Sequence, residues 1–198
     1  MISKESYDEL EKNFGDCASW AVWARPGITP TSNTGDMSVF QKPDLLTILN
    51  PKYVFVGLNA SGTHEGRKDG LKCPWMDFHS SDNKRQHDFK LRYALMDTPY
   101  WGAYITDVIK NYPETKSENV KGYVKEHPEI VKENIEIFEL EMSLFDEQPI
   151  LIALGDDAYK ILQKNLGNKY TIRKTKHYSA WGSKEDYRVD VLIDLQGI

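Results

Sequence analysis

The residues of this sequence that could carry chemistry stand at the ends of its apolar runs. Runs of strand length at 53–58, 104–109 and 149–154 lead into polar or glycine-containing sequence, and a polar and aromatic cluster follows at 177–182. Ligands of an open parallel sheet bind outside the carboxyl ends of its strands, so residues at these points are the candidates for a site. Polar groups fixed there can stabilise the charges that appear as a bond breaks.

A sheet flanked by helices is needed to bring those residues together. The three runs are rich in β-branched and aromatic residues, which is typical of strands buried on both faces of a parallel sheet. Residues 189–195 form a further candidate strand, which Asp190 and Asp194 interrupt.

Helical patterns separate these strands. Apolar residues recur at helical spacing over 7–23, and a second helical stripe begins near Pro128. A third helix follows Gly155 and ends at Gly167, whereas the segment 28–43 has no period and is interpreted as a surface loop. Strands that alternate with helices predict an α/β fold, a three-layer α/β/α sandwich with a short, mostly parallel central sheet.

Length and composition favour one globular domain over residues 1–198. The chain has a mass of 22.8 kDa, and 40% of its residues are hydrophobic and 28% charged, which is ordinary for such a domain. No apolar run is long enough to cross a bilayer, and the sequence begins without a signal-peptide core, so we expect a cytoplasmic protein without a membrane partner. A monomer is expected.

No metal or cofactor is expected. Cys17 and Cys73 are the only cysteines, too few for a disulfide framework or a four-thiolate metal centre. The residues His64, Glu65, Asp77 and His79 could suggest a metal site, but no helical ligand spacing joins them.

Charge is unevenly distributed along the chain. The formal net charge of -5 argues against a protein that coats nucleic acid by bulk attraction. Acidic residues crowd 126–147, whereas basic residues surround a different segment, 67–92. These basic residues, which we call the basic cluster, are Arg67, Lys68, Lys72, Lys84, Arg85, Lys90 and Arg92. A local basic face is one interpretation, and solvated helix surface is the other.

Four short motifs, in the same order, resemble those of the uracil-DNA glycosylase superfamily. Residues 57–62 (Gly-Leu-Asn-Ala-Ser-Gly) are similar to the Gly-hydrophobic-Asn-Pro-Gly motif of its mismatch-specific and single-strand-selective branches. Residues 104–110 resemble its second conserved strand, which usually reads Thr-Asn, and 152–158 its Ala-Leu-Gly-x-x-Ala turn. Residues 177–179 (His-Tyr-Ser) resemble its closing His-Pro-Ser motif.

The resemblance implies hydrolysis of the N-glycosidic bond of uracil, or a related damaged base, that is flipped out of DNA. It implies that Asn59 positions the attacking water and that His177 donates a hydrogen bond to the base oxygen as it gains charge. Phe78 lies where the family places its stacking ring, and Trp181 where the family often inserts an apolar wedge. The same motifs assign the other substrate contacts to Gly57, Leu58, Ser61, Thr106, Asp107 and Ser179.

Two prolines of the family pattern are missing. Ala60 and Tyr178 stand in their places, although proline normally presets these loops. Without the family pattern, simpler interpretations hold: Asn59 is a turn former, His177 a loop histidine and Phe78 an ordinary core ring. Asp107 then caps or solvates a strand end.

Two functions follow as hypotheses. The first is a monofunctional DNA glycosylase, favoured by the basic residues near Asn59. The second is a non-catalytic or re-specialised protein of the same fold, binding a nucleobase, nucleotide or protein partner, favoured by the net acidity and the missing prolines. A nucleotide-dependent enzyme is disfavoured because residues 62–70 lack the terminal Lys-Ser or Lys-Thr of a phosphate loop.

These hypotheses make predictions about the structure. Residues 53–58 should form a central strand, and Asn59 and His177 should converge on one pocket floored by Phe78. The basic cluster should lie on the rim of that pocket, with the glutamates of the helix near Pro128 elsewhere. The residues expected to be buried in the sheet are Val54, Val56, Ile105, Ile150 and Ile152.

Overall fold

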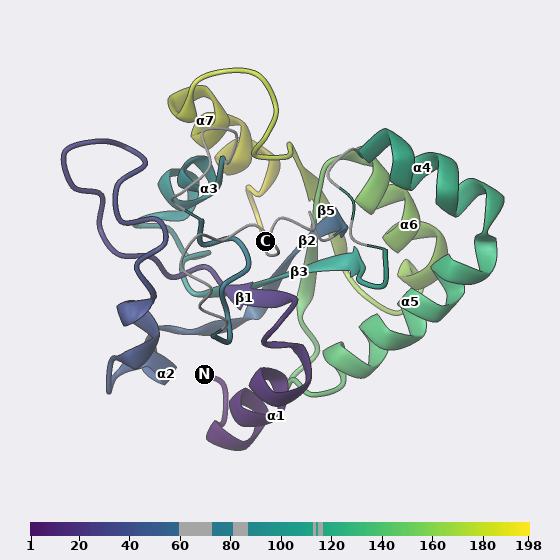
Figure 1. The fold of residues 1–198 in the computed structure, drawn as a ribbon, viewed down its shortest axis with the longest axis horizontal. Coiled ribbons are helices and arrows are strands. Elements are labelled where there is room, and N and C mark those ends of the chain that lie inside the picture. Colours follow the sequence, from purple (N-terminus) through teal and green to yellow (C-terminus); the bar gives the residue numbers. More distant parts are fainter. Residues whose placement is uncertain (60–72, 81–86, 113, 115–116) are drawn as a thin grey trace.

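A five-stranded sheet forms the centre of the protein in a computed structural model that describes residues 1–59, 73–80, 87–112, 114 and 117–198 (Figure 1). Within these residues the strands are β1 (Ala18–Trp20), β2 (Asn50–Asn59), β3 (Ala103–Ile109), β4 (Ile150–Leu154) and β5 (Ile172–Thr175). Their order is β1-β3-β2-β4-β5. Strands β2 to β5 are parallel, and β1 pairs antiparallel to β3 at one edge. The expected strand over 53–58 is therefore the central one.

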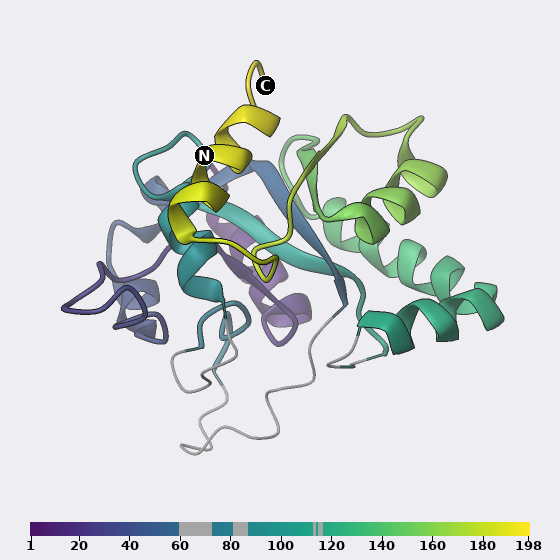
Figure 2. The ribbon, with the colours of Figure 1, turned by 90° about the horizontal axis from the view of Figure 1, so that it is seen from above.

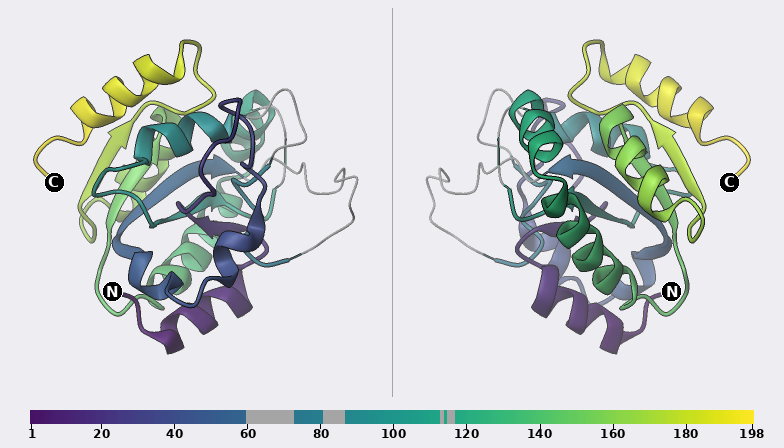
Figure 3. Two further views of the ribbon diagram at one scale, coloured as in Figure 1. Left: turned by 90° about the vertical axis from the view of Figure 1, so that its left-hand side faces the viewer. Right: turned by 90° about the vertical axis from the view of Figure 1, so that its right-hand side faces the viewer.

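Helices cover both faces of this sheet. Figures 1 and 2 show α4 (Ser117–Glu126), α5 (Pro128–Met142) and α6 (Asp156–Leu166) on one side, and α3 (Asp88–Leu95) and α7 (Lys184–Asp194) on the other. The remaining helices are α1 (Lys4–Phe14), the 3-10 helix η1 (Met37–Gln41) and the short α2 (Leu45–Ile48). Figure 3 shows α1 and α7 at opposite ends of the molecule.

The alternation of side chains along β2 explains this layering. Val54 and Val56 point into a core shared with α1, α5 and α6, whereas Tyr53 and Phe55 point into a core shared with α3 and α7. Successive side chains of a strand face opposite sides, so a run that is apolar throughout needs a helical layer on each side. The α/β/α sandwich predicted from the sequence is confirmed.

The predicted burial of the sheet is confirmed for four of its five residues. Val54, Val56, Ile105 and Ile152 are fully buried, whereas Ile150, the first residue of β4, is partly exposed. Among the described residues, none of the helices combines the length and the apolar character that crossing a membrane requires.

The predicted helix over 7–23 is wrong in its second half. Helix α1 ends at Phe14, and the Gly15 N–H closes its last turn on the Glu11 carbonyl at 3.0 Å. The chain then forms β1, in which Ala18, Ser19 and Trp20 are all buried. Apolar residues buried on both faces of a short strand satisfied the helical spacing by coincidence.

The predicted strand over 189–195 is also wrong, because these residues belong to helix α7 and its end. Ser183 and Asp186 form a capping box at the start of this helix, and Tyr187, Val191 and Leu195 are buried at intervals of four residues. Val189 and Ile193 are exposed between them. The two aspartates that interrupted the strand pattern lie on the polar side of the helix.

Candidate functional site

Asn59 and His177 lie on the same edge of the sheet. Asn59 is the last residue of β2, and His177 follows the end of β5 by two residues, with β4 between the two strands. Gly155, directly after β4, has a φ of 94°, and a Cβ built on it would lie 3.6 Å from the His177 Cβ. Two inter-strand spacings place the ends of β2 and β5 on the order of 10 Å apart. Both residues therefore belong to one candidate site at the carboxyl edge.

The His177 ring is held in one orientation by Ser179. The Ser179 N–H donates to His177 Nδ1 at 3.1 Å, and the Ser179 hydroxyl lies 2.7 Å from the same nitrogen. A backbone N–H can only donate, so Nδ1 accepts and the ring proton is on Nε2. Burial, with a smaller contribution from His87, lowers the pKa of His177 to about 4. At neutral pH the ring is neutral and carries an Nε2–H donor.

Tyr178, which stands in place of the family proline, stabilises this loop in another way. Its ring stacks on the His177 ring, with centroids 4.4 Å apart and an angle of 24° between the planes. The Ala180 N–H closes a turn on the His177 carbonyl at 2.9 Å. Tyr178 also packs against the core that the sheet shares with α3 and α7. These contacts restrict the loop without proline.

The Asn59 side chain is fixed at its amide nitrogen. Asn59 Nδ2 donates to the Glu114 carbonyl at 2.8 Å, and the side chain is partly exposed. The carbonyl can only accept, so the contact identifies the nitrogen end of the amide and directs the oxygen away from Glu114. This orientation suits an amide that accepts a hydrogen bond at the site.

Gly57 and Asp107 face each other across β2 and β3. They are paired in register, and a Cβ built on Gly57 would lie 2.1 Å from Asp107 Oδ1, so glycine is needed to accommodate the carboxyl group. Asp107 is 6% exposed, and no described residue donates a hydrogen bond to its carboxylate. Burial raises its pKa to about 7, against the opposing effect of Lys110. The carboxyl group therefore titrates near neutral pH.

Two further buried carboxyl groups have raised pKa values, and one of them, that of Asp77, lies close enough to interact with Asp107. Burial raises the pKa of Asp77 well above its usual range, and repulsion from Asp107 and Asp88 adds to the effect. Burial likewise raises the pKa of Asp88 to about 6. Burial, together with repulsion from all three carboxyl groups, raises the pKa of the Tyr178 hydroxyl. Carboxyl groups with raised pKa values therefore gather around Tyr178 at this edge of the sheet.

Phe78 lies in a strained segment next to Asp77. Phe78 and Trp75 have φ of 64° and 69°, in a region that residues other than glycine rarely adopt. The Phe78 carbonyl accepts a hydrogen bond from Trp23 Nε1 at 3.0 Å, and its partly buried ring packs against the same core as Tyr178. Backbone strain of this kind is found preferentially at functional sites.

Thr106 does not belong to this site. Its side chain is fully buried on the α5 side of the sheet and donates to Glu141 Oε1 at 2.9 Å. Glu141 also forms a buried ion pair with Lys110 at 2.9 Å and accepts from Tyr104 at 3.0 Å. Thr106 therefore helps to attach α5 to β3, and the prediction that it contacts substrate is wrong.

The other predicted site residues are placed as follows. The Leu58 side chain packs toward the α5 and α6 core, and Trp181 is 98% exposed in the loop between β5 and α7. Ser61 lies outside the described residues, as does Ala60.

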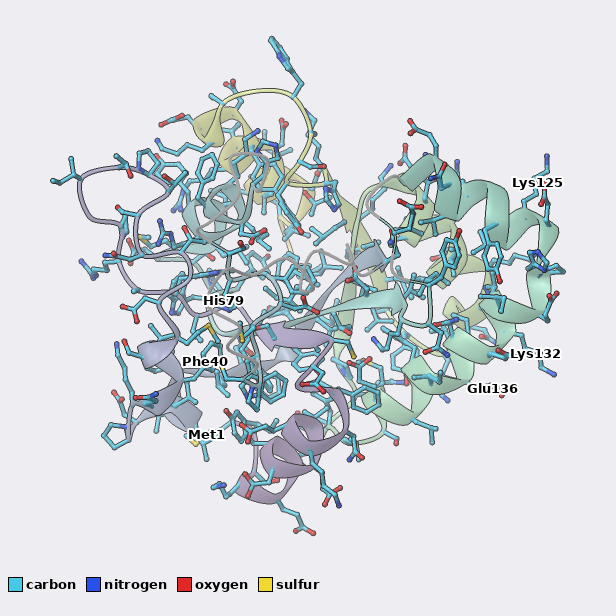
Figure 4. The ribbon with its side chains drawn as sticks, viewed as in Figure 1. Met1, Phe40, His79, Lys125, Lys132 and Glu136 are labelled. Carbon is cyan, nitrogen blue, oxygen red and sulfur yellow. The ribbon has the colours of Figure 1, made fainter. Side chains whose placement is uncertain are left out.

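No group of histidine, cysteine and acidic residues that could hold a metal is found in the described part of the chain. The His79 ring is buried in the interior, and its centroid lies 5.1 Å from that of the Trp23 ring and 5.2 Å from that of the Phe40 ring (Figure 4).

Two members of the basic cluster are not available to phosphates. Lys90 and Arg92 are buried, and their side chains donate to the carbonyls of Ala180, Ala24 and Pro30. For these two residues the prediction of a basic rim is wrong. Arg67, Lys68, Lys72, Lys84 and Arg85 lie outside the described residues. On α5, Glu136 points outward into solvent, as predicted (Figure 4).

Comparisons with family models, curated proteins and solved structures give no match. The resemblance to glycosylases therefore consists of the four short motifs alone. Sequence reasoning missed Asp88 and assigned Lys90 to the basic cluster, although the two side chains contact Ser80 and Ala180, because no local pattern marks a side chain that reaches a loop far along the chain.

Proposed function

We propose that the protein is a monofunctional DNA glycosylase that hydrolyses the N-glycosidic bond of uracil or a related damaged base. The observation that carries the proposal is the fixed, neutral ring of His177, whose Nε2–H is a donor at neutral pH. A neutral donor stabilises an atom that gains negative charge without placing a full positive charge beside the sugar.

In this reaction the electron pair of the N-glycosidic bond leaves with the base, and the sugar carbon becomes positive. A water oxygen then bonds to that carbon, and the proton that the water loses passes to solvent. His177 stabilises the departing base, and Asn59 orients the water through its amide oxygen. No redox cofactor enters the balance, because no atom changes its oxidation state overall.

Asp107 supports the choice of uracil. In its protonated form a carboxyl group presents a donor beside an acceptor, which complements the adjacent carbonyl oxygen and ring N–H of uracil. Burial keeps a substantial fraction of Asp107 protonated at neutral pH, because its pKa is about 7. Ionisation removes the donor and leaves two acceptors.

The proposal is tested with oligonucleotides that carry a single uracil, single-stranded or paired with guanine or adenine. We expect alkali-labile abasic sites to accumulate only with the uracil-containing strands. Hypoxanthine-containing strands extend the test to a deaminated purine. Absence of cleavage on every one of these substrates would contradict the proposal.

The second candidate function is binding of a nucleobase or nucleotide without catalysis. The buried carboxyl group of Asp107 favours it, because it suits a ligand that carries N–H donors better than a DNA phosphate. Isothermal titration with free uracil and guanine distinguishes the two functions. Binding of a free base together with no excision from DNA would support the second.

Trp181 is expected to contribute to DNA binding but not to stability. Its side chain is 98% exposed, so Trp181→Ala should change the free energy of unfolding by less than about 0.5 kcal/mol. Loss of an apolar wedge should weaken binding to uracil-containing duplex about tenfold, measured by fluorescence anisotropy. Ile28→Ala is the matched control, because Ile28 is equally exposed on another loop. Equal affinities of the two variants would refute the role.

A further inference from the structure

The first turn of α3 contacts both loops of the candidate site. Asp88 Oδ2 accepts a hydrogen bond from the Ser80 N–H at 3.1 Å, two residues after Phe78. Lys90 Nζ donates to the Ala180 carbonyl at 2.9 Å, three residues after His177. Residues two apart on a helix point about 200° away from each other, so one turn can reach two loops on different sides.

Both contacts are protected from water. Asp88 is 7% exposed and Lys90 is 6% exposed. Hydrogen bonds to charged groups are roughly twice as strong as those between neutral groups, and solvent competes poorly for buried ones. The two contacts are therefore suited to hold the loops in fixed positions.

Helix α3 is itself anchored to the rest of the protein. Near its end, Arg188 of α7 donates to the carbonyls of Tyr93 and Met96 at 2.6 and 2.8 Å. Arg92 of α3 donates to the Ala24 and Pro30 carbonyls, in the segment between β1 and η1, at 2.9 and 2.6 Å. Figure 1 shows α3 packed beside α7 over the sheet. A displacement of either loop would thus have to break contacts with a rigid element.

We infer that Asp88 and Lys90 are positioning residues, which set the separation between Phe78 and His177 by tying their loops to the first turn of α3. The inference rests on the proposed function, in which the two loops supply the stacking ring and the hydrogen-bond donor. Neither residue contacts the base. Asp88 and Lys90 act through the orientation of Phe78 and His177.

Lys90→Met tests the inference through the His177 ring, whether or not uracil is excised. In the wild type we expect nitrogen NMR to show one tautomer, with the proton on Nε2. In the variant the Nδ1 and Nε2 shifts should converge, because the loop samples orientations in which Ser179 no longer donates. Amide exchange at Ser179 and Ala180 should accelerate about tenfold or more, as expected for loss of one charge-assisted hydrogen bond. Exchange at Phe55 in β2 should not change.

Asp88→Leu provides the complementary test. It should accelerate amide exchange at Ser80 while leaving the His177 tautomer as in the wild type, whereas Asp88→Asn keeps an acceptor and should restore protection. Lys132→Met is the control for loss of a lysine charge, because Lys132 points outward from α5 (Figure 4). On a uracil substrate, Lys90→Met should lower kcat more than it raises KM.

The wild-type protein gives a further measurement that needs no variant. The Lys90 ammonium should give a protected nitrogen signal, in contrast to that of Lys132. An ammonium that exchanges as fast as Lys132, or a folded Lys90→Met with wild-type His177 shifts and Ala180 exchange, would overturn the inference. Normal loop spectra without uracil excision would instead count against the proposed function alone.

Discussion

Replacing Asn59 with alanine is expected to lower uracil excision about a hundredfold, equivalent to roughly 3 kcal/mol of lost transition-state stabilisation. In the proposed mechanism the amide oxygen orients the attacking water, and alanine has no group that can do so. The free energy of unfolding should fall by only about 1 kcal/mol, because the side chain is partly exposed and its amide donates a neutral hydrogen bond to the Glu114 carbonyl. Binding to uracil-containing DNA should stay close to that of the wild type. Single-turnover assays and chemical denaturation measure these quantities.

His177→Ala should lower excision by a similar factor, because in the proposed mechanism it removes the donor that stabilises the departing base. The expected loss is in kcat, since this hydrogen bond strengthens as the base gains charge. Between pH 6 and 8 the variant's activity should depend on pH as the wild type's does, because the wild-type His177 ring is already neutral there.

Matched variants separate these effects from general damage. Asn13 donates to the Glu9 carbonyl at 2.7 Å, as Asn59 does to Glu114, but lies on α1 far along the chain from the site. His127 is a partly exposed histidine at the start of α5. Asn13→Ala and His127→Ala should excise uracil at the wild-type rate. Full activity of both Asn59→Ala and His177→Ala would end the catalytic assignment.

The layers of the fold could be predicted from the sequence because burial on both faces leaves a local signal. Residues 53–58 and 149–154 are apolar throughout, and a strand between two helical layers buries most of such a run. The helix after Gly155 was equally recognisable from its cap and stripe. In these segments local preference and tertiary structure agree.

Segments with ambiguous periodicity could not be assigned this way. β1 is a three-residue strand that continues a helical spacing, and its pairing with β3 involves residues more than eighty positions away. Helix α7 presents Val189 and Ile193 to solvent, so its apolar residues matched a strand. The capping box at Ser183 was the signal that would have corrected this interpretation.

The candidate site was predictable in its motifs but not in its support. Asn59 is the last residue of β2, Asp107 lies near the end of β3 and His177 follows β5, and a parallel sheet brings strand ends together. The contact of Thr106 with Glu141 could not be foreseen, because the side of the sheet that a strand-end residue faces depends on register. The same holds for the contacts that Asp88 and Lys90 make with distant loops.

Asp107→Asn is expected to stabilise the protein above neutral pH. The pKa of Asp107 rises from its ordinary 3.8 to about 7 in the folded state, so the folded state holds a proton that the unfolded chain releases between these values. Wild-type stability therefore falls as pH rises from about 4 to about 7, and the loss is complete above that. One pKa unit is worth 1.36 kcal/mol, so removing the charge should recover at most about 4 kcal/mol at pH 8. Near pH 4 the two proteins should be almost equally stable.

Excision should follow the same ionisation. If protonated Asp107 pairs with the donor and acceptor of uracil, wild-type kcat/KM falls as pH rises through about 7, and Asp107→Asn, which keeps both groups, abolishes that fall. Asp146 is the control of opposite sign: hydrogen bonds from Ser3 and Ser6 lower its pKa, so Asp146→Asn should destabilise the protein at neutral pH and leave the activity profile unchanged. Denaturation at pH 4, 6 and 8, with rates at the same pH values, decides the matter. A stability difference that does not grow between pH 4 and 8 would show that Asp107 is ionised throughout this range. An ionised Asp107 has no hydrogen-bond donor, so it could not pair with uracil as proposed.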